Sequence, residues 1–154
     1  MQQIYKNLFP DLPGHCRVWI YTSNRIISQT ESQEILKEIK SFVSSWQTHQ
    51  KSLNADGTIL LDRCLVFAVD EEIQSISGCS IDSSVKLVKS IGQKYNIDFF
   101  NRLNMLLLKD EHPMMVSYHD LHNYKDHYIF NPNVETLAKM RSEWIIPVLD
   151  STFI

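Results

Sequence analysis

The segment with the strongest chemical character is residues 78–84, Gly-Cys-Ser-Ile-Asp-Ser-Ser. The apolar periodicity after it predicts that a helix begins there. Free backbone N–H groups and the helix dipole stabilise a thiolate at such a position, so Cys79 is a candidate catalytic nucleophile. Gly78, Ser80 and Ser83 are candidate ligand-binding residues, because the same N–H groups can bind an anion. The competing interpretation is a small buried cysteine followed by serines that only cap the helix.

Four of the six histidines lie within sixteen residues, interspersed with two aspartates: His112, His119, Asp120, His122, Asp126 and His127. On a helix, His119 and His122 would share one face and could bind a metal. On a strand they would point to opposite faces, and the surrounding sequence favours a strand end or a loop. We therefore predict no metal site. His119 and His122 are the weak candidates for metal ligands. His112 is a candidate ligand-binding residue.

Two arginines flank predicted strands. Arg25 follows one strand directly, beside Asn24, and Arg102 precedes another. A guanidinium can bind a carboxylate or phosphate through two parallel hydrogen bonds. Asn24, Arg25 and Arg102 are therefore candidate ligand-binding residues. The alternative for Arg102 is a structural ion pair with Asp98.

The chain has only four glycines, at positions 14, 57, 78 and 92. None begins a G-x-G-x-x-G or a G-x-x-x-x-G-K-[ST] run, so the standard phosphate-binding loops are absent and no cofactor is predicted. A net charge of −3 argues against a nucleic-acid-binding protein. Apolar runs such as residues 105–108 are too short for a membrane span. Three cysteines without a C-x-x-C pair, and no signal sequence, predict a cytoplasmic protein with reduced thiols.

The predicted elements begin with an irregular segment, residues 1–16, and a β-branched and aromatic strand at residues 17–21. A helix follows, with a continuous apolar stripe and a capping box formed by Thr30 and Gln33. Its stripe comprises Ile35, Leu36, Ile39, Phe42, Val43 and Trp46. Residues 54–57 are predicted to form a turn, and residues 58–69 a buried strand with a bend at Asp62 and Arg63.

After a loop at residues 70–79, a second helix is predicted with Ser80 or Asp82 as its N-cap. Its expected buried stripe is Ile81, Val85, Val88, Ile91 and Tyr95. Two strands, residues 105–109 and 114–118, should flank a turn at residues 110–113. A third helix is expected from Pro132, capped by Asn131, to about Trp144.

The element order β-α-β-α-β-β-α predicts a single-domain α/β or α+β sandwich with a mixed sheet. Right-handed crossovers would make the first three strands parallel. Their C-terminal ends would then bring Arg25, residues 78–84 and His112 to one edge, where open α/β sheets bind ligands. The alternative is a ferredoxin-like arrangement, which applies if residues 58–69 form a hairpin bent at Asp62 and Arg63.

Three segments together resemble a family of small bacterial proteins that often carry the name ABC transporter ATPase: residues 18–25, residues 78–85 and residues 144–147. The resemblance covers nearly the whole chain. It implies no catalytic residue, cofactor or activity, because the family has none established. An ABC ATPase would require a Walker A loop and an LSGGQ-like signature, and this sequence contains neither.

Three functional hypotheses follow. The first is a non-catalytic module that binds a protein or a small anionic ligand, because no complete catalytic constellation is present. The second is a cysteine-dependent transferase or hydrolase with Cys79 as nucleophile. The third is a metal-dependent hydrolase that uses the histidines of residues 112–127.

Overall fold

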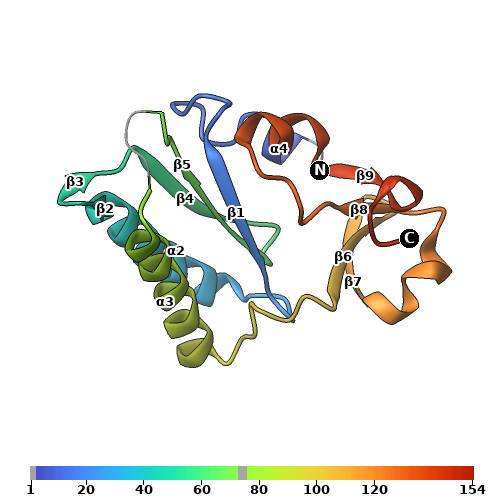
Figure 1. Cartoon of the computed structure of the whole chain (residues 1–154). Coiled ribbons are helices and arrows are strands. Elements are labelled where there is room, and N and C mark those ends of the chain that lie inside the picture. The colour runs from blue at the N-terminus through green and yellow to red at the C-terminus, as the bar shows by residue number, and fades with distance from the viewer. Residues whose placement is uncertain (1–2, 73–75) are drawn as a thin grey trace.

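Two larger antiparallel sheets form the framework of the protein (Figure 1), and the computed structural model describes residues 3–72 and 76–154. The first sheet contains β1 (Arg17–Thr22), β5 (Cys64–Val69) and β4 (Ala55–Leu60), in that order. The second contains β7 (His112–Ser117), β6 (Asn104–Lys109), β8 (Tyr128–Phe130) and β9 (Ile145–Pro147). A short hairpin, β2 (Gln47–Thr48) and β3 (Lys51–Ser52), stands apart from both sheets.

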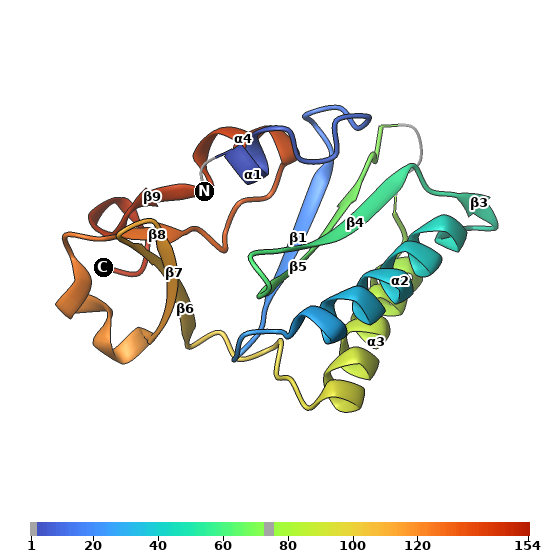
Figure 2. The same ribbon diagram turned by 180° about the vertical axis from the view of Figure 1, so that it is seen from behind.

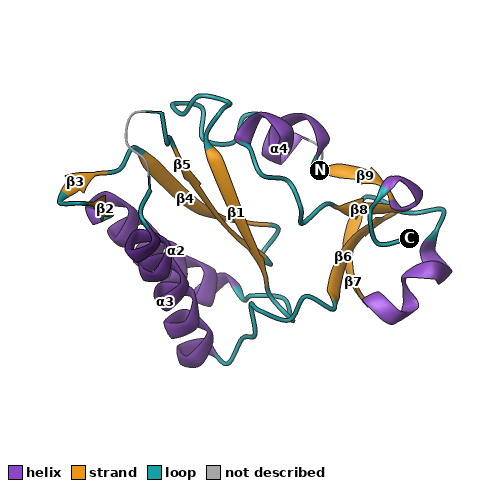
Figure 3. Ribbon diagram, viewed as in Figure 1, coloured by secondary structure: helices purple, strands orange, loops and turns teal. Residues whose placement is uncertain are grey.

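Helices α2 (Gln29–Ser45) and α3 (Gly78–Tyr95) cover one face of the first sheet (Figure 1). The short helices α1 (Gln3–Lys6) and α4 (Leu137–Glu143) lie together near the start of β1, as Figure 2 shows from behind. Two 3-10 helices, η1 (Tyr118–Tyr124) and η2 (Val148–Asp150), follow β7 and β9 (Figure 3). The protein is therefore an α+β fold, as the sequence predicts.

The predicted parallel arrangement of the first three strands is wrong. Residues 58–69 form a hairpin, and β5 pairs antiparallel with both β1 and β4. The turn is made by Leu61 and Asp62, whose φ angles are 60° and 53°. Positive φ at both central residues gives a turn whose twist matches that of the flanking strands. Of the two predictions for residues 58–69, a single bent strand is therefore wrong and the alternative hairpin is confirmed.

The hairpin is the condition on which the ferredoxin-like alternative depends. The order β1-β5-β4, with two helices on one face, fits the first five elements of that β-α-β-β-α-β arrangement. The sixth element departs from it, because β6 joins the second sheet instead of pairing with β1. As a result β1 remains an edge strand of its sheet.

Each helix begins at a different residue from the one predicted. Helix α2 has Ser28 as its N-cap, and the Ser28 and Glu31 side chains form the capping box, two residues before the predicted pair. Helix α3 is capped by Ser77 and helix α4 by Thr136. The chain cannot turn helical at Pro132, because residues 131–135 cross to the first sheet, where the Val18 N–H donates to the Glu135 carbonyl.

The buried face of α3 also differs from the predicted stripe. Ser80, Ser84, Val88 and Ile91 are buried, whereas Ile81 and Val85 are only half-buried. The two serines can lie in the core because backbone carbonyls satisfy their hydroxyl groups: Ser80 Oγ donates to Gln47 O, and Ser84 Oγ to Ile81 O. Small side chains are favoured beside the buried ring of Trp46, whose Nε1 donates to the Ser80 carbonyl.

Residues 54–57 were predicted as a turn, but β4 already begins at Ala55. Gly57 is a strand residue that allows α2 to pack closely on the sheet. A Cβ atom added at Gly57 would lie 2.7 Å from Ile39 Cγ2. The glycine therefore marks a close approach of helix and strand, and the sequence alone does not distinguish this from a turn.

One hydrophobic cluster joins the two sheets. It contains Val18 and Val66 from the first sheet, Leu106 and Phe130 from the second, and Trp144 at the end of α4. A shared core of this kind makes the two sheets one structural domain. No helix in the described part of the chain is both long and apolar enough to span a membrane.

Candidate functional site

A cavity of about 410 Å³ lies where the edge of β1 meets the beginning of the second sheet. This volume is within the range of ligand-binding pockets. Figures 1 and 2 show β1 on the side of the first sheet that faces β6. The cavity lining combines apolar with polar side chains: Ile20, Tyr21, Thr22, Phe99, Phe100, Asn101, Arg102, Asn104, Met105, Pro132, Asn133 and Phe153.

The outer edge of β1 forms one wall of the cavity. In an antiparallel ladder, alternate residues direct their backbone groups to opposite sides of the strand. The Val18 N–H donates outward to Glu135 O, whereas the Ser23 N–H donates toward the hairpin, to Arg63 O. The backbone N–H and C=O groups of Ile20 and Thr22 therefore face outward, into the cavity. In the described part of the chain, β5 is the only strand that pairs along β1.

Arg102 is the only lysine or arginine among the residues that line the cavity. Its side chain is exposed, and it makes no hydrogen bond or ion pair within residues 3–72 and 76–154. Asp98, the partner suggested by the sequence, instead accepts a hydrogen bond of 2.9 Å from the Phe100 N–H. The guanidinium of Arg102 is therefore free to bind an external anion.

Three asparagines line the cavity together with Arg102, and two of them form hydrogen bonds within the protein. Asn101 Oδ1 accepts a hydrogen bond of 3.0 Å from the Leu103 N–H, and Asn133 Nδ2 donates to Thr152 Oγ1 at 3.2 Å. The Asn101 hydrogen bond stabilises the loop before β6, whereas the Asn133 hydrogen bond connects the segment after β8 with the C-terminal segment. Asn104, at the start of β6, adds a third amide to the cavity.

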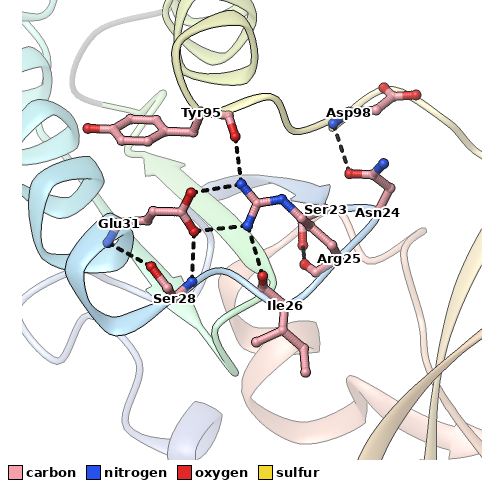
Figure 4. Close-up of polar contacts among 8 residues, drawn as sticks. All are labelled: Ser23, Asn24, Arg25, Ile26, Ser28, Glu31, Tyr95 and Asp98. Carbon is pink, nitrogen blue, oxygen red and sulfur yellow. Dashed lines mark hydrogen bonds and ion pairs between the residues drawn. The ribbon is translucent and has the colours of Figure 1, made fainter.

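Arg25 has the opposite environment (Figure 4). Its Nη1 and Nη2 atoms donate to the two carboxylate oxygens of Glu31 at 2.9 and 2.8 Å. Nη2 also donates to the Tyr95 carbonyl at 2.6 Å and Nη1 to the Ile26 carbonyl at 3.0 Å. Four of the five N–H donors of the guanidinium therefore have partners inside the protein. Arg25 ties the start of α2 to the C-terminal end of α3.

Glu31 is strongly affected by this arrangement. The hydrogen bonds from Arg25 lower the pKa of its carboxyl to about 2, and the backbone N–H of Ser28 contributes further. The hydrogen bonds with the Glu31 carboxylate in turn raise the pKa of the Arg25 guanidinium. Glu31 thus serves both as the capping residue of α2 and as the counterion of Arg25.

The Arg25 region also positions a wall of the cavity (Figure 4). Asn24 Oδ1 accepts a hydrogen bond of 2.9 Å from the Asp98 N–H. Asp98 in turn holds Phe100, whose ring meets the ring of Tyr21 at a centroid distance of 5.6 Å. Asn24 therefore acts on the cavity indirectly, by fixing the loop that carries Phe99 and Phe100.

The predicted meeting of Arg25 with residues 78–84 does not occur, and the parallel sheet on which it depended is absent. Arg25 binds the Tyr95 carbonyl at the C-terminal end of α3, whereas Gly78 and Cys79 begin that helix. Eighteen residues of helix separate the two ends by roughly 26 Å. His112 lies at the start of β7, in the other sheet. Part of the predicted loop at residues 70–79, namely 73–75, lies outside the described residues.

Within residues 78–84, the cysteine and the serines have different surroundings. Cys79 is exposed in the first turn of α3, whereas Ser80 is buried. Ser83 Oγ donates to the Cys79 carbonyl at 3.0 Å, so this hydroxyl serves the helix backbone. The roles predicted for Gly78, Cys79, Ser80 and Ser83 remain predictions.

The histidine cluster lies on η1 and its flanks, so the predicted loop or strand end is wrong at residues 118–124. Residues three apart eclipse each other on a 3-10 helix, which brings His119 and His122 to one side. Across the described residues, no three histidine, cysteine, aspartate or glutamate side chains are grouped to hold a metal ion. His127 Nδ1 lies 2.8 Å from Asp126, a surface pair.

Of the predicted ligand-binding residues, only Arg102 lines the cavity. Nothing in the sequence singles out Ile20, Thr22 or Asn104, because each is an ordinary residue type for its strand. A signal existed in the asparagines at positions 101, 104, 131 and 133, which are dense on both sides of the cavity.

Comparison with protein-family models, curated proteins and solved structures found no match to this chain. The resemblance to the small bacterial proteins named ABC transporter ATPase therefore remains a prediction.

Proposed function

We propose that this chain is a non-catalytic binding module whose ligand carries an anionic group and occupies the cavity beside β1. The observation that supports this is Arg102, a cation in the cavity lining with no partner among the described residues. An arginine without a counterion binds carboxylates or phosphates through parallel hydrogen bonds. The neighbouring Asn101, Asn104 and Asn133 supply amide groups that can orient the same ligand.

The remaining lining favours binding over catalysis. Apart from Arg102, Tyr21 is the only titratable residue among the described residues that line the cavity, and burial raises the pKa of its hydroxyl. General acid–base catalysis and nucleophilic catalysis both depend on groups such as histidine, carboxylate or thiol. The apolar residues, among them Phe99 and Met105, provide the contact surface typical of a ligand pocket.

The proposal is tested by titrating the ¹⁵N-labelled protein with succinate and, separately, with inorganic phosphate. We expect chemical-shift changes at Asn101, Arg102 and Asn104, with affinity that decreases as salt increases. Arg102→Gln should weaken binding about tenfold, which corresponds to one charge-assisted hydrogen bond. Arg63→Gln is the matched control, because it removes the same charge from the β4–β5 turn, outside the cavity.

Two results would contradict the proposal. One is a titration in which neither succinate nor phosphate affects any residue of the cavity. The other is equal weakening by Arg102→Gln and Arg63→Gln, which would indicate a general effect of charge.

A further inference from the structure

We propose, in addition, that the natural ligand is an extended peptide segment with an acidic side chain, which adds to β1 as a further strand. This inference rests on the proposed function, since it identifies the ligand class of the same cavity. In β-augmentation, main-chain hydrogen bonds provide affinity, and pockets for alternate side chains provide specificity. The cavity beside β1 offers both unpaired main-chain groups and side-chain pockets.

The main-chain partners are the outward-facing groups of Ile20 and Thr22. Each residue presents one N–H and one C=O to the cavity, in the alternation set by the Val18–Glu135 hydrogen bond. The edge without a pairing strand extends over residues 19–22, about 13 Å at the usual rise per residue. A segment of four or five extended residues can therefore satisfy these groups.

The protein already pairs a segment with the beginning of this edge. Arg17 and Thr136 form an isolated antiparallel bridge, and Glu135 accepts the hydrogen bond from Val18. The backbone of β1 thus has the correct orientation to continue the ladder toward Thr22. An added strand would extend a pairing that the fold has begun.

The side-chain environment suits a strand with apolar residues and one carboxylate. Successive residues Ile20 and Tyr21 point to opposite faces of the sheet, so the cavity offers apolar contacts on both. Tyr21 contacts Phe100 on one face, and Ile20 packs against the cluster shared by the two sheets on the other. Arg102 gives the acidic residue its partner and thereby sets the position of the segment along the edge.

The cavity favours a peptide over a second copy of this chain. The edge of β1 forms a wall of a hollow, together with Phe99, Met105 and Pro132 from other segments. For two recessed edges to pair, the surrounding walls of both chains would have to separate. A single extended segment can enter between those walls without such a change.

The experiment uses a pool of N-acetylated, C-amidated hexapeptides with one central aspartate and varied valine, isoleucine, phenylalanine and threonine residues around it. Members that bind are identified by nuclear magnetic resonance with the intact ¹⁵N-labelled chain. We expect the amide protons of Ile20 and Thr22 to become protected from hydrogen exchange, at least about tenfold, when the peptide binds. Replacing the aspartate with asparagine should weaken binding by wild type but have little effect on binding by Arg102→Gln.

A second measurement leaves the protein unchanged. The backbone amides of the tightest-binding hexapeptide are divided into two alternating sets. One version of the peptide is N-methylated on the first set, and a second version is N-methylated on the other set. Only one set faces β1 in an added strand, so one version should lose affinity at least about tenfold and the other should retain it. Equal affinity of the two versions would overturn the inference.

The outcomes separate this inference from the proposed function. Succinate binding that depends on Arg102, without any peptide that protects Ile20 and Thr22, overturns the peptide and leaves the anion-binding function intact. Absence of both responses overturns the function itself. Protection of Ile20 and Thr22 that increases with protein concentration alone would assign the edge to a second copy of the chain, and would also overturn the inference.

Discussion

Arg25 and Arg102 show how the same side chain can have opposite roles within one molecule. Both follow or precede a strand, and both were interpreted from the sequence as anion-binding residues. Glu31, Tyr95 and Ile26 supply acceptors for four N–H groups of Arg25, whereas no described residue supplies an acceptor for Arg102. The comparison shows that surroundings, more than residue type, distinguish a structural arginine from one that can bind a ligand.

The largest expected difference between the two arginines is in stability. Arg25→Gln should lower the free energy of unfolding by about 1–2 kcal/mol, because it leaves Glu31 without its bidentate partner. The effect stays below that of a fully buried pair, since the Arg25 side chain is 36% exposed and water screens the charges. Arg102→Gln should change stability by less than about 0.5 kcal/mol. Urea denaturation of both variants measures the difference, and equal losses would contradict it.

Loss of the Asn24 hydrogen bond should have a smaller effect, and it should change both the stability of the protein and its affinity for succinate. Asn24→Ala removes the hydrogen bond to the Asp98 N–H, which should lower stability by about 1 kcal/mol. It should also weaken succinate binding, but less than Arg102→Gln does, because Asn24 only positions the loop of Phe99 and Phe100. Asn123→Ala, an exposed position on η1 outside the cavity lining, is the control variant. An affinity loss in Asn24→Ala larger than in Arg102→Gln would reverse the assigned roles.

The Arg25–Glu31 pair should also make stability depend on acid pH. The pKa of Glu31 is about 2 in the folded protein, against an ordinary value of 4.5. Because the pKa of Glu31 is lower in the folded protein, the ion pair stabilises the protein fully above pH 4.5, and this stabilisation is lost as the pH falls toward 2. Glu31→Gln should therefore show a shallower decline of the urea midpoint in this interval than wild type. Identical pH profiles of the two proteins would show that the pair does not contribute.

The smallest effect is expected from modification at the other end of α3. Cys79 is exposed, whereas Cys16 and Cys64 are buried, and burial raises their pKa to about 11 and about 12. Iodoacetamide should therefore modify one thiol per folded chain, and three after unfolding, as mass spectrometry can show. Modification of Cys79 should leave succinate affinity unchanged. A loss of affinity would move the binding site toward residues 78–84.

The sequence predicts a helix or strand correctly where one periodicity dominates a segment. The strand at residues 17–21 and the helix containing Ile35, Ile39 and Val43 were predicted because their apolar spacing is regular. For residues 58–69 the sequence favours one strand, with a hairpin only as the alternative, because Leu61 and Asp62 are neither the glycine nor the asparagine that marks such turns. That error made the strands parallel and placed Arg25 beside Cys79.

The candidate site was harder to predict because backbone groups and distant segments form much of it. The sequence identified Arg102 by its chemistry, but nothing local shows that Asp98 bonds to Phe100 instead. The edge of β1 becomes available only because β6 joins another sheet, which is a property of the whole topology. Side-chain chemistry can be inferred from a sequence, whereas an unpaired strand edge requires the fold.

The turn at Leu61 and Asp62 has a consequence for how the chain folds. The other two hairpins turn at residues 49–50 and 110–111, and these residues also have positive φ without being glycine. L-residues other than glycine are disfavoured in this conformation by roughly 1 kcal/mol each. Because such turns form unfavourably on their own, they nucleate folding poorly. We expect the strands to pair only after α2 and α3 have formed and packed against the hydrophobic core. In this chain the hairpins would be late products of folding, and the helices its nucleus.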